Sequence, residues 1–237
     1  MALSLAARRA RQHFDERAPL YDRELGRREP SYRRVLQAML WLLDMPADRP
    51  AHILELGVGT GNQTRLLLRQ FPACRVTGYD VSPAMLARAR RKLAPFRGRV
   101  KLVVGDFGAG LAGGPYDAVL SANAIHHVPR PRLGALFQRL FELLRPGGQV
   151  VIAEPFWPGD EALGDLYWKA RRRALAAAGI EVRDHDRALA RQSSHGGGHQ
   201  VTVEEYLRRL RRAGFAEVDC PWRELGRGIV HGRRPRS

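Results

Sequence analysis

Glycines and a carboxylate at fixed spacing mark the part of this chain that could do chemistry. A short apolar run, typical of a strand buried on both faces, contains Glu55 and is followed by Gly57, Gly59 and Gly61. Residues 62–71 then carry apolar side chains at helical spacing. A strand, a tight glycine turn and a helix bring bare backbone N–H groups and the positive end of a helix dipole against a ligand. The sequence therefore predicts a ligand-binding loop here.

Two kinds of ligand fit such a loop, and the side chains favour one. A GxGxxG turn holds the diphosphate of a dinucleotide, but here the third glycine comes one residue early and Asn62 fills the later slot. Glu55 precedes the first glycine by two residues, and a carboxylate there repels a diphosphate and attracts a cation. We therefore favour a cationic ligand, and a purely structural tight turn is the alternative.

A second carboxylate follows the next predicted strand. Residues 74–80 read as a strand that ends on Asp80, about 20 residues after the last glycine of the loop. At that spacing an acidic side chain reaches the two hydroxyls of a ribose, and a carboxylate makes charge-assisted hydrogen bonds to both. The competing role, N-cap of the following helix, falls to Ser82, which precedes Pro83 at the first helical turn. We expect Asp80 to bind a ribose.

The order of the predicted elements defines the fold class. Apolar segments alternate with helical patterns, and such repeated β/α steps predict a parallel sheet with right-handed crossovers. The strands are expected at residues 52–56, 74–80, 99–104, 116–122 and 149–154. Ligands bind such a sheet at the carboxyl ends of its strands, where Glu55, Asp80, Asp106 and Asn123 all fall. We expect an α/β fold with a Rossmann-like parallel sheet of about seven strands and an antiparallel last strand.

Around this core we expect three further regions. Residues 1–48 read as an N-terminal helical cap, broken near Pro19, and residues 49–154 form the core. Residues 155–200 are too long for a turn and too charged for a core, so we expect a lid or substrate insertion packed on the cap. Residues 201–237 read as a C-terminal helix, opened by a capping box at Thr202, and a closing pair of strands.

These motifs together resemble those of the class I S-adenosylmethionine (SAM) methyltransferases. The Glu-x-Gly-x-Gly-x-Gly pattern at residues 55–61 resembles the first motif of that family, and the LRPGG sequence at 144–148 resembles its turn into the fifth strand. The resemblance covers residues 50–155 and, more loosely, 201–232. It implies that SAM, which carries a sulfonium and an ammonium, is the cofactor. It also implies methyl transfer to an acceptor, which we expect to be a small molecule.

The resemblance further implies roles for individual residues. Asp106 would accept a hydrogen bond from the adenine amino group, Phe107 would pack on the adenine ring, and the backbone at Asn123 would line the methionine half of SAM. Residues 14–22 resemble the FD..A..YD segment that folds over the cofactor in many small-molecule and tRNA-modifying methyltransferases, which makes Tyr21 a candidate cofactor contact. The alternative is that the aromatic side chains of this segment only dock it on the core.

Methyl transfer needs few catalytic side chains, because the sulfonium is already activated and alignment in a dry pocket can suffice. A base is needed only for a hydroxyl or similar acceptor, and His126 and His127 are the candidates because they follow the fourth strand. We expect only one of these neighbours to face the pocket, and packing or capping roles are the alternative. We expect no metal, because His195 and His199 flank glycines that do not hold a rigid helix.

Composition restricts the partners. The formal net charge is +16, but only three of the 40 basic residues are lysine, which favours a genomic base-composition bias over a phosphate-binding track. The two cysteines indicate no disulfide framework, and no apolar segment reaches the ~18 residues of a membrane span. Because no signal-peptide pattern is present either, we expect a cytoplasmic protein without a membrane partner. The sequence leaves the oligomeric state open.

Two alternatives to this function remain. Within the same fold, the start and the end of the chain also resemble the carboxy-SAM synthase branch linked to tRNA wobble-uridine modification. That chemistry needs an arginine for the added carboxylate, and Arg187 or Arg191 could serve. In another class of protein, the fold would be a non-catalytic scaffold that binds nucleic acid. The presence of both the glycine loop and the carboxylates argues against that second alternative.

Overall fold

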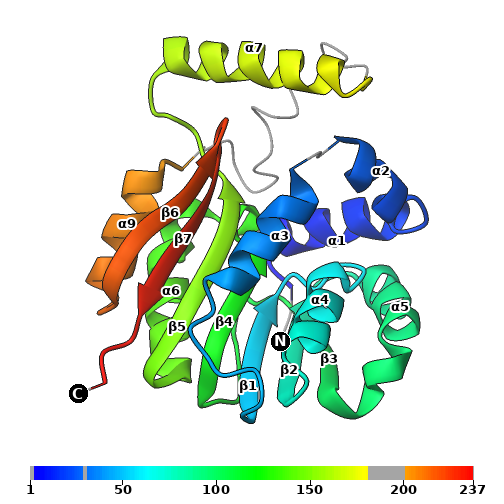
Figure 1. Ribbon diagram of the computed structural model, residues 1–237, viewed down its shortest axis with the longest axis vertical. Helices are drawn as coiled ribbons and strands as arrows, with labels where there is room; N and C mark the ends of the chain where they lie inside the picture. The colour runs from blue at the N-terminus through cyan, green and yellow to red at the C-terminus, as the bar shows by residue number, and fades with distance from the viewer. Residues whose placement is uncertain (1–2, 29–30, 181–200, 237) are drawn as a thin grey trace.

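The computed structural model describes residues 3–28, 31–180 and 201–236. Within them a seven-stranded sheet runs in the order β3-β2-β1-β4-β5-β7-β6 (Figure 1). Its strands are β1 (Ala51–Leu56), β2 (Cys74–Asp80), β3 (Val100–Val104), β4 (Tyr116–Ala122), β5 (Leu144–Pro155), β6 (Ala216–Glu224) and β7 (Arg227–Arg233). The first five strands pair in parallel, and β7 pairs antiparallel with both β5 and β6. The predicted Rossmann-like sheet with an antiparallel closing strand is therefore confirmed.

Helices pack on both faces of this sheet because its central strands are buried on both sides. Along β5, Val150 and Ile152 join one hydrophobic cluster while Val151 and Ala153 join the other, as the alternation of side chains in a strand requires. The first cluster is completed by α6 (Leu133–Leu143) and α9 (Val203–Arg212). The second is completed by α3 (Tyr32–Trp41), α4 (Asn62–Gln70) and α5 (Pro83–Lys92).

The N-terminal residues form a pair of helices over the carboxyl ends of the parallel strands. These are α1 (Leu5–Arg17) and α2 (Tyr21–Arg28), and in Figure 1 they lie above α4 and α5. The break between them contains Pro19, as expected. Ser4 caps α1, because its hydroxyl oxygen accepts a hydrogen bond from the Ala7 N–H at 3.2 Å.

The segment after β5 begins with a long helix, α7 (Glu161–Ala177), drawn at the top of Figure 1. Tyr167 of α7 lies against the turn between β6 and β7, where its Cδ2 is 3.8 Å from the Cβ position of Gly226. Residues 181–200 lie outside the described residues. The arginines and histidines discussed above for that stretch, Arg187, Arg191, His195 and His199, therefore have no structural account.

Two local expectations need correction. The LRPGG segment does not precede the fifth strand as a turn; it belongs to β5, which begins at Leu144 and shifts register before Gln149. At α9, Thr202 accepts a hydrogen bond from the Glu205 N–H at 3.1 Å, which is one half of the expected capping box. The Glu205 carboxylate turns instead to two arginines, because charge-assisted hydrogen bonds to guanidinium groups are stronger than one to a backbone amide.

The state of the two cysteines and the character of the helices are the remaining points raised by the composition. Cys74 and Cys220 are free thiols. Among the described helices, none combines the length and the apolar character that crossing a membrane requires.

Candidate cofactor and active site

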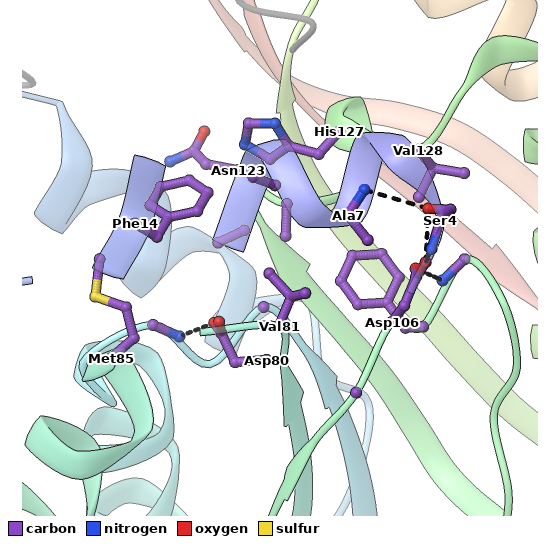
Figure 2. Close-up of a pocket in the computed structure, with 18 of the residues that line it drawn as sticks. Ser4, Ala7, Phe14, Asp80, Val81, Met85, Asp106, Asn123, His127 and Val128 are labelled. Atoms are coloured by element: carbon purple, nitrogen blue, oxygen red, sulfur yellow. Dashed lines mark hydrogen bonds between the residues drawn. The ribbon is translucent and has the colours of Figure 1, made fainter. Parts of the chain in front are cut away.

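A pocket opens at the carboxyl ends of β1 to β4 and is covered by α1 (Figure 2). The space between its walls, together with the open solvent at its mouth, is about 730 Å³. Most of the site residues predicted from the sequence line it, namely Tyr21, Gly57, Gly59, Asp80, Asp106, Phe107, Asn123 and His127. Glu55, Gly61 and His126 are not part of its lining.

The glycine loop shows why each of its glycines is needed. Gly57, Gly59 and Gly61 all have positive φ, at 75°, 55° and 84°, a conformation that favours glycine. A Cβ on Gly57 would lie 2.2 Å from the Cβ of Ala124, and a Cβ on Gly61 would lie 3.0 Å from Leu93, the C-cap residue of α5. At Gly59 nothing lies within 4 Å. The first and third glycines therefore serve packing, and the second leaves open space for a ligand.

Asp80 is fixed between the glycine loop and the start of α5. Its Oδ2 accepts a hydrogen bond from the Gly59 N–H at 2.7 Å, and its Oδ1 accepts one from the Ser82 N–H at 2.8 Å. Burial raises the pKa of this carboxyl to about 6, against the effect of these two donors. Ser82 caps α5 by accepting from the Met85 N–H, as expected. Asp80 thus also positions the loop, a role that the sequence did not indicate.

Glu55 lies near the end of β1, is buried, and is not part of the pocket lining. It is fully buried, and its Oε2 accepts a hydrogen bond from Thr64 Oγ1 at 2.7 Å. Its Oε1 is a buried oxygen with no hydrogen-bond donor among the described residues. Burial raises the pKa of Glu55 to about 8, so the carboxyl is mainly neutral at pH 7. In the structure without ligand, Glu55 is therefore held within the core by Thr64.

Asp106 is joined to the first residues of the chain. Its Oδ2 accepts a hydrogen bond from Ser4 Oγ at 2.8 Å, and its Oδ1 accepts one from the Gly108 N–H at 2.9 Å (Figure 2). Ser4, Ala7, Ala10 and Phe14 recur on one face of α1 and line the pocket. The small side chains of Ser4, Ala7 and Ala10 leave room for a ligand beneath the helix. No motif in the sequence indicated the hydrogen bond between Ser4 and Asp106.

The FD..A..YD segment divides its work between aromatic and acidic residues. Phe14 and Tyr21 line the pocket. The acidic residues that follow them, Asp15 and Asp22, attach α1 and α2, which together form the cover of the pocket, to the core. Asp15 Oδ1 accepts hydrogen bonds from Ser82 Oγ at 2.5 Å and from the Ala84 N–H at 3.2 Å. Asp15 therefore supplements Ser82 at the start of α5 and ties α1 to it.

Asp22 makes the second attachment of the cover. Its Oδ1 accepts hydrogen bonds from Thr60 Oγ1 at 2.5 Å and Asn62 Nδ2 at 3.0 Å, and its Oδ2 accepts one from Lys92 Nζ at 2.8 Å. Although partial burial opposes ionisation, the hydrogen bonds from Lys92, Thr60 and Asn62 hold the pKa of Asp22 below its usual value. The start of α2 is thereby tied to the glycine loop itself.

A buried glutamate contacts one of the two histidines and the backbone that precedes them. Glu154, at the end of β5, accepts hydrogen bonds at Oε1 from the Ala124 and Ile125 N–H groups, and its Oε2 lies 2.5 Å from His126 Nδ1. The His127 ring lies 4.1 Å from the His126 ring. A tautomer that donates from Nδ1 to Glu154 leaves Nε2 of His126 as an acceptor. Glu154 was missed, although an apolar strand ending on a carboxylate is the same signal that identified Asp80.

Arg227 is a second residue that the sequence did not reveal. Its Nη1 donates a hydrogen bond to Asn123 Oδ1 at 2.7 Å. Arg227 begins the antiparallel strand β7, whereas the sequence pattern indicates ligand-binding residues only at the carboxyl ends of parallel strands. For the part of the chain that the structure describes, no group of three or more His, Cys, Asp or Glu residues is placed to hold a metal ion.

Comparison with known proteins shows the family of the chain. A family model described as a methyltransferase domain matches residues 53–148. An uncharacterized methyltransferase of Geobacillus kaustophilus is 32% identical over 164 residues, 68% of this chain and 74% of the relative. A carboxy-S-adenosyl-L-methionine synthase of Aeromonas salmonicida is 28% identical over 214 residues, 87% of this chain and 84% of the relative. A trans-aconitate 2-methyltransferase of Streptomyces coelicolor is 33% identical over 176 residues, 72% of this chain and 52% of the relative.

Solved structures show the same fold. The DhpI–SAH complex superposes with a TM-score of 0.67 at 22% identity and covers 98% of both chains. The fold and the glycine loop therefore define a class I, Rossmann-like nucleotide-cofactor protein. With the sequence relatives, the chain belongs to the SAM-dependent methyltransferases, and SAM is its cofactor.

Proposed function

We propose that this methyltransferase acts on a small-molecule acceptor by direct displacement. Bound SAM supplies an activated methyl group, which forms a bond to the acceptor's nucleophilic atom as its bond to sulfur breaks and leaves S-adenosylhomocysteine (SAH). The protein's task is to align the two partners and exclude water. The observation that carries the proposal is the convergence of the glycine loop, Asp80 and Asp106 on one covered pocket.

The residues present suit the cofactor. Asp106 would accept from the adenine amino group, Phe107 would lie against the ring, and Asp80 would accept from the ribose hydroxyls. The open space at Gly59 and the backbone at Asn123 would hold the methionine part. Tyr21 would close this part of the pocket from α2. Glu55 is not part of the lining and accepts a hydrogen bond from Thr64 in α4, so in this proposal it supports the loop from the core side.

A small acceptor is supported by the cover and by one relative. The pocket lies beneath α1, and Asp15 and Asp22 tie α1 and α2 to the core, which restricts access to compact molecules. The relative from Streptomyces coelicolor is named for the methylation of trans-aconitate, a small molecule. A nucleic-acid scaffold stays the alternative from another class, and electrophoretic binding at physiological salt would reveal it.

The histidines supply a base where the acceptor needs one. His127 lines the pocket and would take the proton of a hydroxyl acceptor. His126 would position it, because Glu154 fixes the His126 ring and the two rings lie side by side. For an acceptor that needs no deprotonation, alignment alone suffices and both histidines serve packing.

A carboxy-SAM synthase is the second candidate function. The Aeromonas salmonicida relative spans most of both chains, which favours this candidate, whereas Arg187 and Arg191 lie outside the described residues. The mass spectrum of the ligand that co-purifies with the protein separates the two functions. SAM or SAH supports methyl transfer, and carboxy-SAM supports the synthase.

We also propose that residues 155–200 form a lid or substrate insertion, with residues 1–48 as the cap, 49–154 as the cofactor-binding core and 201–237 as the closing unit. In α7 the buried residues are Gly164 and Leu175, and most of the other side chains are exposed or half-buried, so closure over an acceptor would bury more of this helix. Hydrogen exchange in α7 should slow when SAH and the acceptor are both bound. Unchanged exchange there would assign acceptor binding to another part of the chain.

A further inference from the structure

One face of α5, which lies beneath the cover in Figure 1, holds the cover at three points. Residues spaced four apart on a helix share one side of it, and the three α5 residues in contact follow that spacing. The contacts are those of the Ala84 N–H with Asp15 Oδ1 at 3.2 Å, of Arg88 Nη2 with the Pro19 carbonyl at 3.0 Å and of Lys92 Nζ with Asp22 Oδ2 at 2.8 Å. The last of these is an ion pair, and it also reaches the glycine loop.

The Lys92 ammonium meets oxygen acceptors from two different parts of the chain. Besides Asp22 of the cover, Nζ donates to Thr60 Oγ1 at 3.0 Å and to Asn62 Oδ1 at 2.5 Å, within and directly after the glycine loop. An ammonium has three N–H donors, so these three acceptors use all of them. Only 17% of the Lys92 side chain is exposed, which limits the screening of these contacts by solvent and salt.

The acceptors of Lys92 are also bonded to one another. Thr60 Oγ1 and Asn62 Nδ2 both donate to Asp22 Oδ1, at 2.5 Å and 3.0 Å. Asp22 and Lys92 therefore each contact both loop residues, and these four side chains form what we call the Lys92 network. Because opposite charges bridge the same two polar side chains, the network joins the cover, the loop and α5 in one place.

The Lys92 network lies beside the pocket. None of its four residues is part of the lining, but the residues directly before Asp22 and Thr60 in the chain, Tyr21 and Gly59, do line the pocket. The Gly59 N–H also donates to Asp80 Oδ2 at 2.7 Å, next to the proposed ribose contact. Lys92 is therefore placed to hold two walls of the pocket together rather than to contact a ligand.

We propose that Lys92 is a positioning residue for the cofactor, which holds the cover and the glycine loop closed on it together. A cofactor between these two walls leaves only when one of them moves, and Lys92 bonds both. The inference rests on the proposed placement of SAM in this pocket. The competing explanation is that the Lys92 network only stabilises the fold and has no effect on a bound cofactor.

The geometry calls for lysine and not only for positive charge. Only three of the 40 basic residues of the chain are lysine, so arginine is the usual cation here and this position departs from it. An ammonium is compact and directs its donors away from a single plane, whereas a guanidinium is larger and donates within one plane. Arginine at this largely covered position would keep the charge and lose part of the contacts.

The test measures SAH dissociation by stopped flow in Lys92→Met, Lys92→Arg and the control Arg91→Met. Arg91 is the exposed neighbour of Lys92 in α5, so its replacement removes the same charge from the same helix. We expect SAH to leave about 10- to 100-fold faster from Lys92→Met and about 3- to 10-fold faster from Lys92→Arg, and at the parental rate from Arg91→Met. Parental dissociation from Lys92→Arg alone would overturn the requirement for lysine.

Two further measurements separate positioning from folding. A purely structural Lys92 would lower the melting temperature of the ligand-free protein and leave the dissociation rate of SAH unchanged. If Lys92 acts through the cover, adding Lys92→Met to Asp22→Asn should speed dissociation by less than the product of the two single effects, since both changes break the same contact. Effects that multiply would show that Lys92 does not join the cover to the loop.

The outcomes also separate this inference from the proposed function. If Lys92→Met releases SAH at the rate of Arg91→Met, the inference is wrong although the parent still binds SAH. Failure of the parent to bind SAH would overturn the proposed cofactor placement itself. Should Lys92→Met not fold, Lys92→Arg and Thr60→Val replace it, because the second removes one acceptor of Lys92 and keeps the shape of the side chain. Parental dissociation of SAH from both would overturn the inference.

Discussion

Ser4 Oγ donates a hydrogen bond to Asp106 Oδ2 across 2.8 Å, which joins the N-cap of α1 to the carboxylate that follows β3. The cover of the pocket and the proposed adenine site are therefore one connected unit. Movement of α1 away from the pocket would break this hydrogen bond. Its return would place α1 over the adenine proposed to bind at Asp106. Release of a bound cofactor should accordingly depend on residues of the cover as well as on residues of the pocket floor.

The first prediction concerns that contact. Ser4→Ala should cost about 0.5–2 kcal/mol of stability through the lost cap and should also speed SAH dissociation by about 2- to 10-fold, because α1 opens more readily. Thr202→Ala removes the N-cap of α9, away from the pocket, and serves as the matched control. Stopped-flow dissociation of SAH from both variants is the measurement. Equal dissociation rates in the two variants would show that Ser4 only caps its helix.

The second prediction concerns the attachment at Asp22. Asp22→Asn weakens the contact to Lys92 and leaves an amide where Thr60 and Asn62 donate. The SAH dissociation rate should rise by about 10- to 100-fold, with a smaller effect on the association rate. Asp48→Asn, on the exposed loop before β1, removes the same charge elsewhere. If the two variants release SAH at the same rate, α2 does not hold the cover closed.

The contrast between what was and was not predicted follows from sequence distance. The strands, the glycine loop and Ser82 as a cap depend on neighbours in the chain, so local patterns indicated them. The contact of Ser4 with Asp106 joins residues 102 positions apart, and that of Arg227 with Asn123 joins residues 104 apart. No local pattern encodes such contacts. The pattern also identified Glu55 as part of the motif without indicating that it is buried and not part of the pocket lining.

The third prediction concerns pH. Burial raises the pKa of Asp80 to about 6 in the protein without ligand, and the proposed ribose contact requires the ionised carboxylate. A ligand that binds only the ionised form lowers this pKa, so SAH affinity should rise as pH increases through about 6 and level off above it. Calorimetric titrations from pH 5 to 7.5 measure the effect. Asp80→Asn should show weak binding without this dependence, and the same pH profile in both proteins would assign the titration to another group.

The fourth prediction concerns the histidines. For a hydroxyl acceptor, His127→Ala should lower single-turnover methyl transfer by about 100- to 10,000-fold while SAH affinity stays nearly unchanged. Glu154→Gln should have a smaller effect, because the His126 ring loses the carboxylate oxygen that orients it. For a thiol or neutral amine acceptor, the loss should stay within a few fold. A hydroxyl acceptor with equal rates in the parent and His127→Ala would remove histidine from the mechanism.

The central claim is that the pocket under α1 binds the cofactor with its ribose on Asp80. The most direct measurement is calorimetric binding of SAH and of its 2′-deoxy analogue to the parent and to Asp80→Asn. The account predicts micromolar SAH binding by the parent and binding weaker by about 10- to 150-fold in the variant. It further predicts that loss of the hydroxyl weakens binding in the parent and not in the variant, because the two changes remove the same contact. Full SAH affinity in Asp80→Asn, or an equal penalty for the deoxy analogue in both proteins, would contradict it.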